Sequence, residues 1–162
     1  MTVIIVHHRG ATSDGTLASI LDNMCSLSVK EAEGQELLEP GTVYLAPANY
    51  HLRVEKDKTL ALTVDETVNY SRPSIDVLFE SAANVFGQGL IGVILTGANE
   101  DGSQGLKIIK EAGGITVVQD PATAEVSAMP QAAVDCVEVD HLLPLEKIGP
   151  FLVDVAKRGS VD

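Results

Sequence analysis

One apolar segment and the polar turn after it constrain this chain more than any other feature. Residues 90–95 read Leu-Ile-Gly-Val-Ile-Leu, and residues 96–102 read Thr-Gly-Ala-Asn-Glu-Asp-Gly. A run of that length with β-branched residues predicts a strand buried on both faces, as in a parallel sheet covered by helices. In open α/β folds, ligands bind beyond the carboxyl ends of such strands. Asp101 is therefore a candidate site residue.

Composition and length favour the same fold class. The chain has 162 residues, of which 45% are hydrophobic and only 4% aromatic, with no tryptophan. Its core must therefore consist mainly of aliphatic side chains, the usual filling of helix-covered parallel sheets. The length predicts a single domain over residues 1–162. We expect an α/β fold with a doubly wound, mostly parallel, Rossmann-like sheet flanked by helices.

Apolar spacing and turn residues predict alternating strands and helices. The expected strands cover residues 3–6, 27–31, 43–46, 90–95, 115–118 and 137–139, and the expected helices cover 17–24, 74–87, 102–112, 129–134 and 144–156. Thr12, Ser13 and Asp14 are candidate caps for the first helix. The alternating segments 51–55 and 60–64 predict a small antiparallel hairpin at the edge of the fold, with one solvent-exposed face.

Charge and cysteine content argue against several classes of function. With a formal net charge of −12, the chain lacks the clustered cations that bind a nucleic-acid backbone. Cys25 and Cys136 show no CxxC spacing, so we expect neither a zinc site nor a disulfide framework. The apolar start of the chain is too short for a signal peptide or a membrane span. We therefore expect no membrane insertion and a cytoplasmic location.

Candidate catalytic side chains follow two of the predicted strands. His7 and His8 come after the strand at 3–6, and Asp101 follows the strand at 90–95. A histidine whose ring contacts a carboxylate is the orienting half of a nucleophilic triad, which also needs a hydroxyl or a thiol. The pattern alone leaves simpler alternatives open. Asp101 also fits a helix N-cap, and the two histidines fit a solvated strand end.

A set of longer motifs narrows the choice. These motifs lie at residues 38–47, 51–52, 73–79, 93–102, 112–114, 119–121 and 129–133. Taken together, they resemble the catalytic domain of the CheB-type protein-glutamate methylesterases of bacterial chemotaxis. Their order and spacing also match that family. The resemblance extends over nearly the whole chain.

The resemblance implies an activity and a site. Members of the family hydrolyse methyl esters on glutamates of chemoreceptor cytoplasmic helices with a Ser-His-Asp triad, and some also deamidate glutamines there. They release methanol and use no metal or organic cofactor. Matching the motifs makes His8 the general base and Asp101 the triad carboxylate. The backbone N–H of Ala98 lies where the family's loop holds the oxyanion. The other loop candidates are Thr96, Gly97 and Met129.

The family's nucleophile has no counterpart in this sequence. It is a serine in a Gly-x-Ser-Thr-Gly-Gly loop that precedes the histidine's strand by a helix, whereas only seven residues precede His8. The remaining serines suit other positions. Ser13 and Ser74 fit helix caps, Ser81 a helix interior and Ser103 a first helical turn, and none has the glycine context of a nucleophile turn.

The site loop also departs from the family pattern. Ala98, Asn99 and Glu100 stand where the family has Met, Gly and usually Asn, and Ser-Ala at 127–128 replaces an aromatic-Gly pair. Glu100 adds negative charge beside the triad acid, which would raise the pKa of one of the two carboxyl groups.

These observations predict an N-terminally incomplete methylesterase domain without a receiver domain. Because removal of a triad nucleophile costs several orders of magnitude in rate, we expect background activity from this chain alone. One alternative is a non-catalytic binding or regulatory module derived from the family, and a weaker one is an unrelated small-ligand domain. Loss of the first strand also predicts exposed apolar sheet surface and self-association.

Overall fold

Strands and helices alternate along most of the chain in the computed structural model, which describes residues 1–10 and 15–159. The strands are β1 (Val3–Ile5), β2 (Ser28–Glu31), β3 (Thr42–Leu45), β4 (His51–Val54), β5 (Leu60–Thr63), β6 (Ile91–Ile94), β7 (Ile115–Gln119) and β8 (His141–Leu143). The helices are α1 (Thr16–Met24), α2 (Ile75–Phe86), α3 (Ser103–Glu111), α4 (Ala128–Cys136) and α5 (Leu145–Arg158), with short 3-10 turns η1 (Gly87–Gly89) and η2 (Pro121–Thr123).

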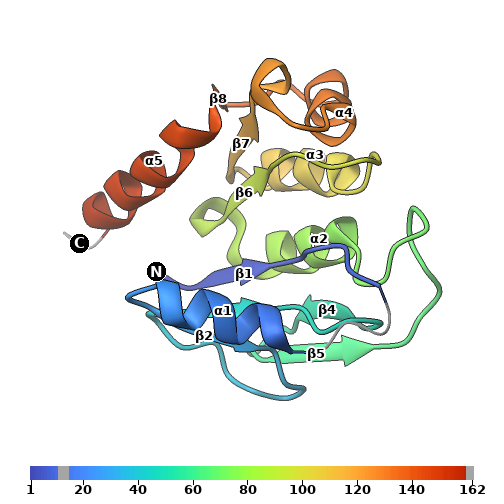
Figure 1. Ribbon diagram of the computed structural model, residues 1–162, viewed down its shortest axis with the longest axis vertical. Coiled ribbons are helices and arrows are strands. Elements are labelled where there is room, and N and C mark those ends of the chain that lie inside the picture. The colour runs from blue at the N-terminus through green and yellow to red at the C-terminus, as the bar shows by residue number, and fades with distance from the viewer. Residues whose placement is uncertain (11–14, 160–162) are drawn as a thin grey trace.

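The parallel strands form two three-stranded sheets, in the orders β1-β3-β2 and β6-β7-β8, while β4 and β5 form an antiparallel pair. The predicted α/β class with a small hairpin is confirmed. Figure 1 shows α2 between the layer that contains β1 to β5 and the layer that contains β6 to β8. Within the described residues, β1 pairs only with β3 and β6 only with β7, so each is an edge strand.

Burial of β6 differs from the expectation of a strand covered on both faces. Gly92 and Ile94 are buried, but Ile91 and Val93 on the other face are only half-buried. All three residues of β1 are also half-buried. The incomplete cover coincides with the edge position of both strands.

The hairpin packs one of its faces into the core, as its alternating sequence predicts. Leu52, Val54 and Leu60 pack with Tyr44 of β3 and Leu78 of α2 in one apolar cluster. In β4 only Arg53 is exposed. On the other face Arg53 is exposed and Ala61 and Thr63 are half-buried, as an alternating hairpin predicts, whereas His51 on that face is buried.

A second difference concerns the last strand. Residues 137–139 form no strand, and β8 begins at His141. Val137 ends α4, where its N–H donates to the carbonyl of Ala133 at 3.1 Å. Val137 and Val139 pack against the cluster around Ile94, so their apolar alternation reflects an irregular buried segment. The candidate caps Thr12 to Asp14 lie outside the described residues.

The N-terminal halves of α2 and α3 approach closely, and this contact positions the site. A Cβ atom at Gly105 would lie 2.6 Å from Phe79 Cβ and 3.1 Å from Asp76 Cα. The Gly105 N–H donates to Asp76 Oδ1 at 2.6 Å. Only glycine permits this packing, which brings the loop before α3 onto the first turn of α2. Among the helices within residues 15–159, none is long and apolar enough to cross a membrane.

Candidate active site

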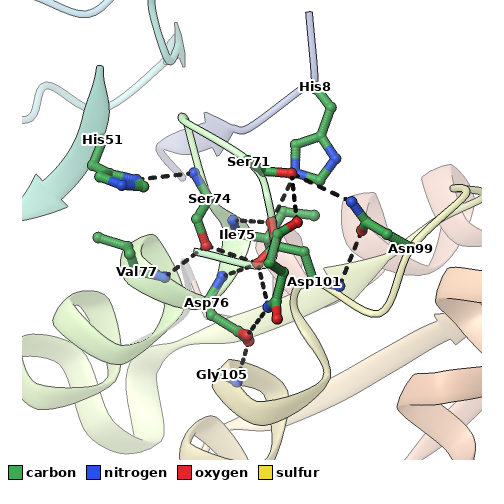
Figure 2. Close-up of polar contacts among 11 residues, drawn as sticks. His8, His51, Ser71, Ser74, Ile75, Asp76, Val77, Asn99, Asp101 and Gly105 are labelled. Carbon is green, nitrogen blue, oxygen red and sulfur yellow. Dashed lines mark hydrogen bonds and ion pairs between the residues drawn. The ribbon is translucent and has the colours of Figure 1, made fainter. Parts of the chain in front are cut away.

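The two residues expected to form the acid-base pair meet at the centre of a polar network (Figure 2). His8 Nε2 lies 2.7 Å from Asp101 Oδ2, although 93 positions separate them in the sequence. The Asp101 side chain is 0% exposed, whereas that of His8 is 27% exposed. Because an ionised carboxylate only accepts hydrogen bonds, Nε2 carries the proton in this contact. The other ring nitrogen, Nδ1, is then free to accept a proton.

Asp101 also caps a helix, but not the one that follows it. The N–H groups of Ile75 and Asp76 donate to its carboxylate at 2.7 and 3.2 Å, and the Ser74 hydroxyl donates to Oδ1 at 2.7 Å. These N–H groups belong to the first turn of α2, where the backbone has no partner within the helix and the helix dipole favours an anion. The helix that Asp101 precedes, α3, has Gly102 as its N-cap, with φ +98°.

These contacts decide the ionisation of Asp101. Burial alone raises the pKa of its carboxyl group, but hydrogen bonds from His8, Ser74 and the two backbone N–H groups outweigh that effect and lower the pKa below its ordinary value. Asp101 is therefore an anion at neutral pH. It can orient the His8 ring and stabilise the imidazolium that forms when His8 takes a proton.

A second carboxylate, Asp76, lies beside the first. Asn69 Nδ2 donates to Asp76 Oδ2 at 3.0 Å and to Asp101 Oδ1 at 3.4 Å, and so bridges the two groups. Burial and the negative charge of Asp101 raise the pKa of Asp76, although hydrogen bonds from Gly105 N–H and Asn69 oppose the rise. Glu100, the expected source of like charge, is exposed.

His51 supports the network from the hairpin. It is 1% exposed, its Nε2 donates to the Glu66 carbonyl at 2.8 Å, and the Ser74 N–H donates to its Nδ1 at 3.2 Å. One nitrogen donates and the other accepts, so this pair of contacts requires the neutral ring with its proton on Nε2. His51 thereby fixes the residue whose hydroxyl binds Asp101. His51 and Asp76 fall within motifs that the sequence marked, but the motifs did not reveal these contacts.

The site loop is held by its own hydrogen bonds. Thr96 N–H donates to Gln119 Oε1 at 2.9 Å, and Gly97 N–H donates to the Val126 carbonyl at 3.1 Å. Met129 N–H donates to the Gly97 carbonyl at 3.0 Å, and a Cβ at Gly97 would lie 2.7 Å from the Met129 sulfur. Thr96, Gly97 and Met129 therefore shape the loop.

Ala98 differs from its neighbours in this loop. It is exposed, and its N–H makes no hydrogen bond within the described part of the chain. Of the oxyanion candidates in residues 96–98, only Ala98 keeps a backbone donor available.

The described serines make contacts other than with His8. Ser74 caps α2, where its Oγ accepts from Val77 N–H at 3.5 Å, and Ser81 Oγ donates to the Leu78 carbonyl at 2.9 Å. Ser103 lies buried in the first turn of α3. Ser13 is outside the described residues.

Ser71 is a serine that the sequence interpretation overlooked. It lines a cavity of about 370 Å³ together with His8, Arg9 and Arg72. Its hydroxyl donates to the Asn69 carbonyl and accepts from Asn99 Nδ2, both at 3.3 Å. Asn99 Oδ1 in turn accepts from Asp101 N–H at 3.0 Å. Ser71 is thus engaged in positioning the acid loop, and nothing in its local spacing marks it.

A comparison with known families identifies the lineage of this site. A sequence model described as CheB methylesterase matches residues 1–152. The chain belongs to the CheB methylesterase family. The family and fold expected from the motifs are thus confirmed, and homologues of this chain are protein-glutamate methylesterases.

Individual CheB relatives agree with this assignment. A Leptospira interrogans protein named as a protein-glutamate methylesterase/protein-glutamine glutaminase is 56% identical over 151 residues, which are 93% of this chain and 78% of that protein. A Nitratidesulfovibrio vulgaris protein of the same name is 38% identical over 156 residues, but the match covers only 42% of its length. The crystal structure of the Thermotoga maritima CheB methylesterase catalytic domain has a TM-score of 0.89 and 34% identity, and the match covers 94% of this chain and 82% of that one.

Proposed function

We propose that residues 1–162 form one CheB-type domain in which His8 is the general base and Asp101 the triad carboxylate for hydrolysis of glutamyl methyl esters. The observation that carries this proposal is the 2.7 Å contact between His8 Nε2 and a fully buried Asp101. A buried anion on one ring nitrogen makes the other a competent base. By the family resemblance, the substrates are esterified glutamates on chemoreceptor cytoplasmic helices.

The orientation of the ring determines which nitrogen moves the proton. In the well-described protease triad the carboxylate holds Nδ1 and Nε2 serves the nucleophile. Here Asp101 holds Nε2. His8 Nδ1 therefore takes the proton when a serine hydroxyl attacks the ester carbonyl carbon. The imidazolium then returns this proton to the methoxy group, which leaves as methanol.

A second half-reaction restores the enzyme. Water loses a proton to His8 Nδ1 and attacks the acyl-serine ester, and the serine oxygen leaves with that proton as free glutamate is released. Attack on a glutamine amide follows the same path with ammonia as the leaving group. The N–H of Ala98 is the proposed donor to the oxyanion, within a loop shaped by Thr96, Gly97 and Met129. These steps use no metal or organic cofactor.

We propose that the nucleophile is a serine on polypeptide outside this sequence. Among the described serines, Ser71 and Ser74 belong to the network, and both hydroxyls donate to acceptors other than His8. We therefore expect residues 1–162 alone to bind the ester and to hydrolyse it only at background rate. The reaction is proposed to take place in the cytoplasm.

A fusion tests these roles. A strand, the family's Gly-x-Ser-Thr-Gly-Gly loop and the helix that follows this loop in the family are joined ahead of Met1, and methanol release from an esterified receptor fragment is measured. We expect the fusion to be active and sensitive to a fluorophosphonate, and the original chain to be neither. His8→Gln should lower kcat/KM of the fusion by about 10²- to 10⁴-fold. Asp101→Asn should lower it by up to about 10⁴-fold.

Glu100→Gln is the matched control, because it neutralises an exposed carboxylate one position from Asp101 and should leave the rate near that of the parent fusion. Parental turnover in the His8→Gln fusion would show that His8 is not the base. Fast, fluorophosphonate-sensitive hydrolysis by the original chain would show that the nucleophile lies within it.

A further inference from the structure

A tight turn next to the two buried carboxylates has unusual backbone geometry. Val68 and Ser71 exchange two backbone hydrogen bonds, of 3.1 and 2.9 Å. Between them, Asn69 has φ +50° and Tyr70 has φ +61°. Two central residues with positive φ are the pattern of a type I′ turn, which favours Asn followed by Gly. Asn69 suits its position, whereas a tyrosine at the second position is strained.

The turn is fixed to the catalytic network. The Asn69 side chain donates to both Asp76 and Asp101, and Ser71 accepts from Asn99 of the acid loop. These contacts tie the residues on either side of Tyr70 to the loop that carries Asp101. A side chain at this position is presented to whatever approaches the site.

The Tyr70 ring makes no packing contact that would offset the backbone strain at this position. Its exposure is 101%, so the ring buries no surface. Glycine at this position would relieve the strained φ without loss of any packing. Folding alone therefore favours glycine over tyrosine, and an exposed aromatic ring on a rigid turn suits contact with another molecule.

The position of Tyr70 indicates what that molecule is. Tyr70 borders the cavity that contains His8 and also a second hollow lined by Asn99, Glu100 and Ala128. It thus stands between the proposed base and the surface beside the acid loop. A substrate polypeptide whose esterified glutamate reaches His8 therefore passes the Tyr70 side chain.

We propose that Tyr70 is a specificity-determining residue, which packs against the substrate polypeptide next to the esterified glutamate. The inference rests on the proposed function, because it requires the ester to bind at His8. A contact of this kind makes the site favour a polypeptide substrate over a small ester. Because the ring is fully exposed, its surface is available to the flanking polypeptide, and we expect the polypeptide, not a small ester, to gain binding energy from Tyr70.

The test uses the unmodified chain and two probes. One is a synthetic chemoreceptor segment bearing a glutamyl γ-methyl ester, and the other is the N-acetyl, N-methylamide of the same esterified glutamate. NMR titration follows the His8 imidazole signals and gives both affinities. We expect Tyr70→Gly to weaken binding of the segment about fivefold or more and to leave the small ester unaffected. Its unfolding midpoint should be no lower than that of the parent.

Lys58→Gly is the matched control, because Lys58 also has a positive φ of 65° and is exposed, but lies in the turn between β4 and β5. It should relieve strain equally and leave both affinities unchanged. If the segment shifts the His8 signals and binds the parent and Tyr70→Gly equally well, the inference is overturned and the proposed function stands. If neither probe shifts the His8 signals, the proposed function fails, and the inference fails with it.

Discussion

At the residue scale, Asp101 combines a structural and a chemical role in one carboxylate. It caps α2 and accepts a hydrogen bond from His8, so the same carboxylate stabilises the helix and orients the ring of the proposed base. Because its pKa is lowered in the folded state, its ionisation contributes stability above the unfolded pKa, and that contribution is lost as pH falls through the folded pKa. Asp76, whose pKa is raised, favours the fold only at low pH, and this benefit is lost as pH rises through its folded pKa.

His51 offers a test of how the hairpin supports the base. His51→Phe keeps an apolar ring of similar size but removes the acceptor of Ser74 N–H and the donor to Glu66. Each lost partner leaves a polar group unsatisfied, so we expect a loss of about 1–3 kcal/mol in the free energy of unfolding. The His8 imidazole signals should also change, because Ser74 no longer holds Asp101 in place. Urea unfolding and NMR measure the two effects.

His51→Gln separates positioning from bulk, since its amide offers both a donor and an acceptor. It should recover part of the stability and move the His8 signals back toward the parent. If the His8 signals of His51→Phe match those of the parent, the hairpin does not position the site.

At the element scale, the close packing of α2 against α3 holds the carboxylates of Asp76 and Asp101 next to each other. Gly105→Ala places a methyl group against Phe79 Cβ and the backbone of Asp76, so the two helices must separate. We expect a loss of about 1–3 kcal/mol. Ser19 is an exposed residue inside α1. Ser19→Ala should therefore leave the protein as stable as the parent or up to about 0.5 kcal/mol more stable, because only helix propensity changes. Equal effects of the two substitutions in urea unfolding would contradict this account.

The elements also show what local sequence can and cannot predict. Apolar periodicity located α2, α3, the three strands of the first parallel sheet, and β6 and β7 of the second, because those signals are local. The strand expected at 137–139 was wrong, since period-two apolar spacing also suits an irregular buried segment. The pairing of His8 with Asp101 was predicted from the family resemblance and not from the local pattern of either segment. Capping of α2 by Asp101 and the bridge made by Asn69 were not predicted, because they join segments distant in sequence.

At the scale of the whole molecule, the two parallel sheets present edge strands within the described residues. β1 and β6 each carry half-buried apolar side chains and one unpaired backbone edge. Such edges are templates for pairing with another strand. They are also where the carboxyl ends of β1 and β6 lead to His8 and to the acid loop. A strand docked there would therefore lie next to the proposed site.

This geometry predicts that the chain self-associates through its sheet edges. Sedimentation velocity over a range of concentrations should show reversible growth in size.

Val93→Lys places a charge on β6, where the residue is half-buried, and should shift the distribution toward monomer. Val153→Lys is the control, because Val153 is 51% exposed on α5, which belongs to neither sheet, and should leave association unchanged. The fusion that supplies a strand and the serine loop should also be less associated, since its added strand competes for the same edges. A parent chain that sediments as a monomer at every concentration would show that these edges do not pair.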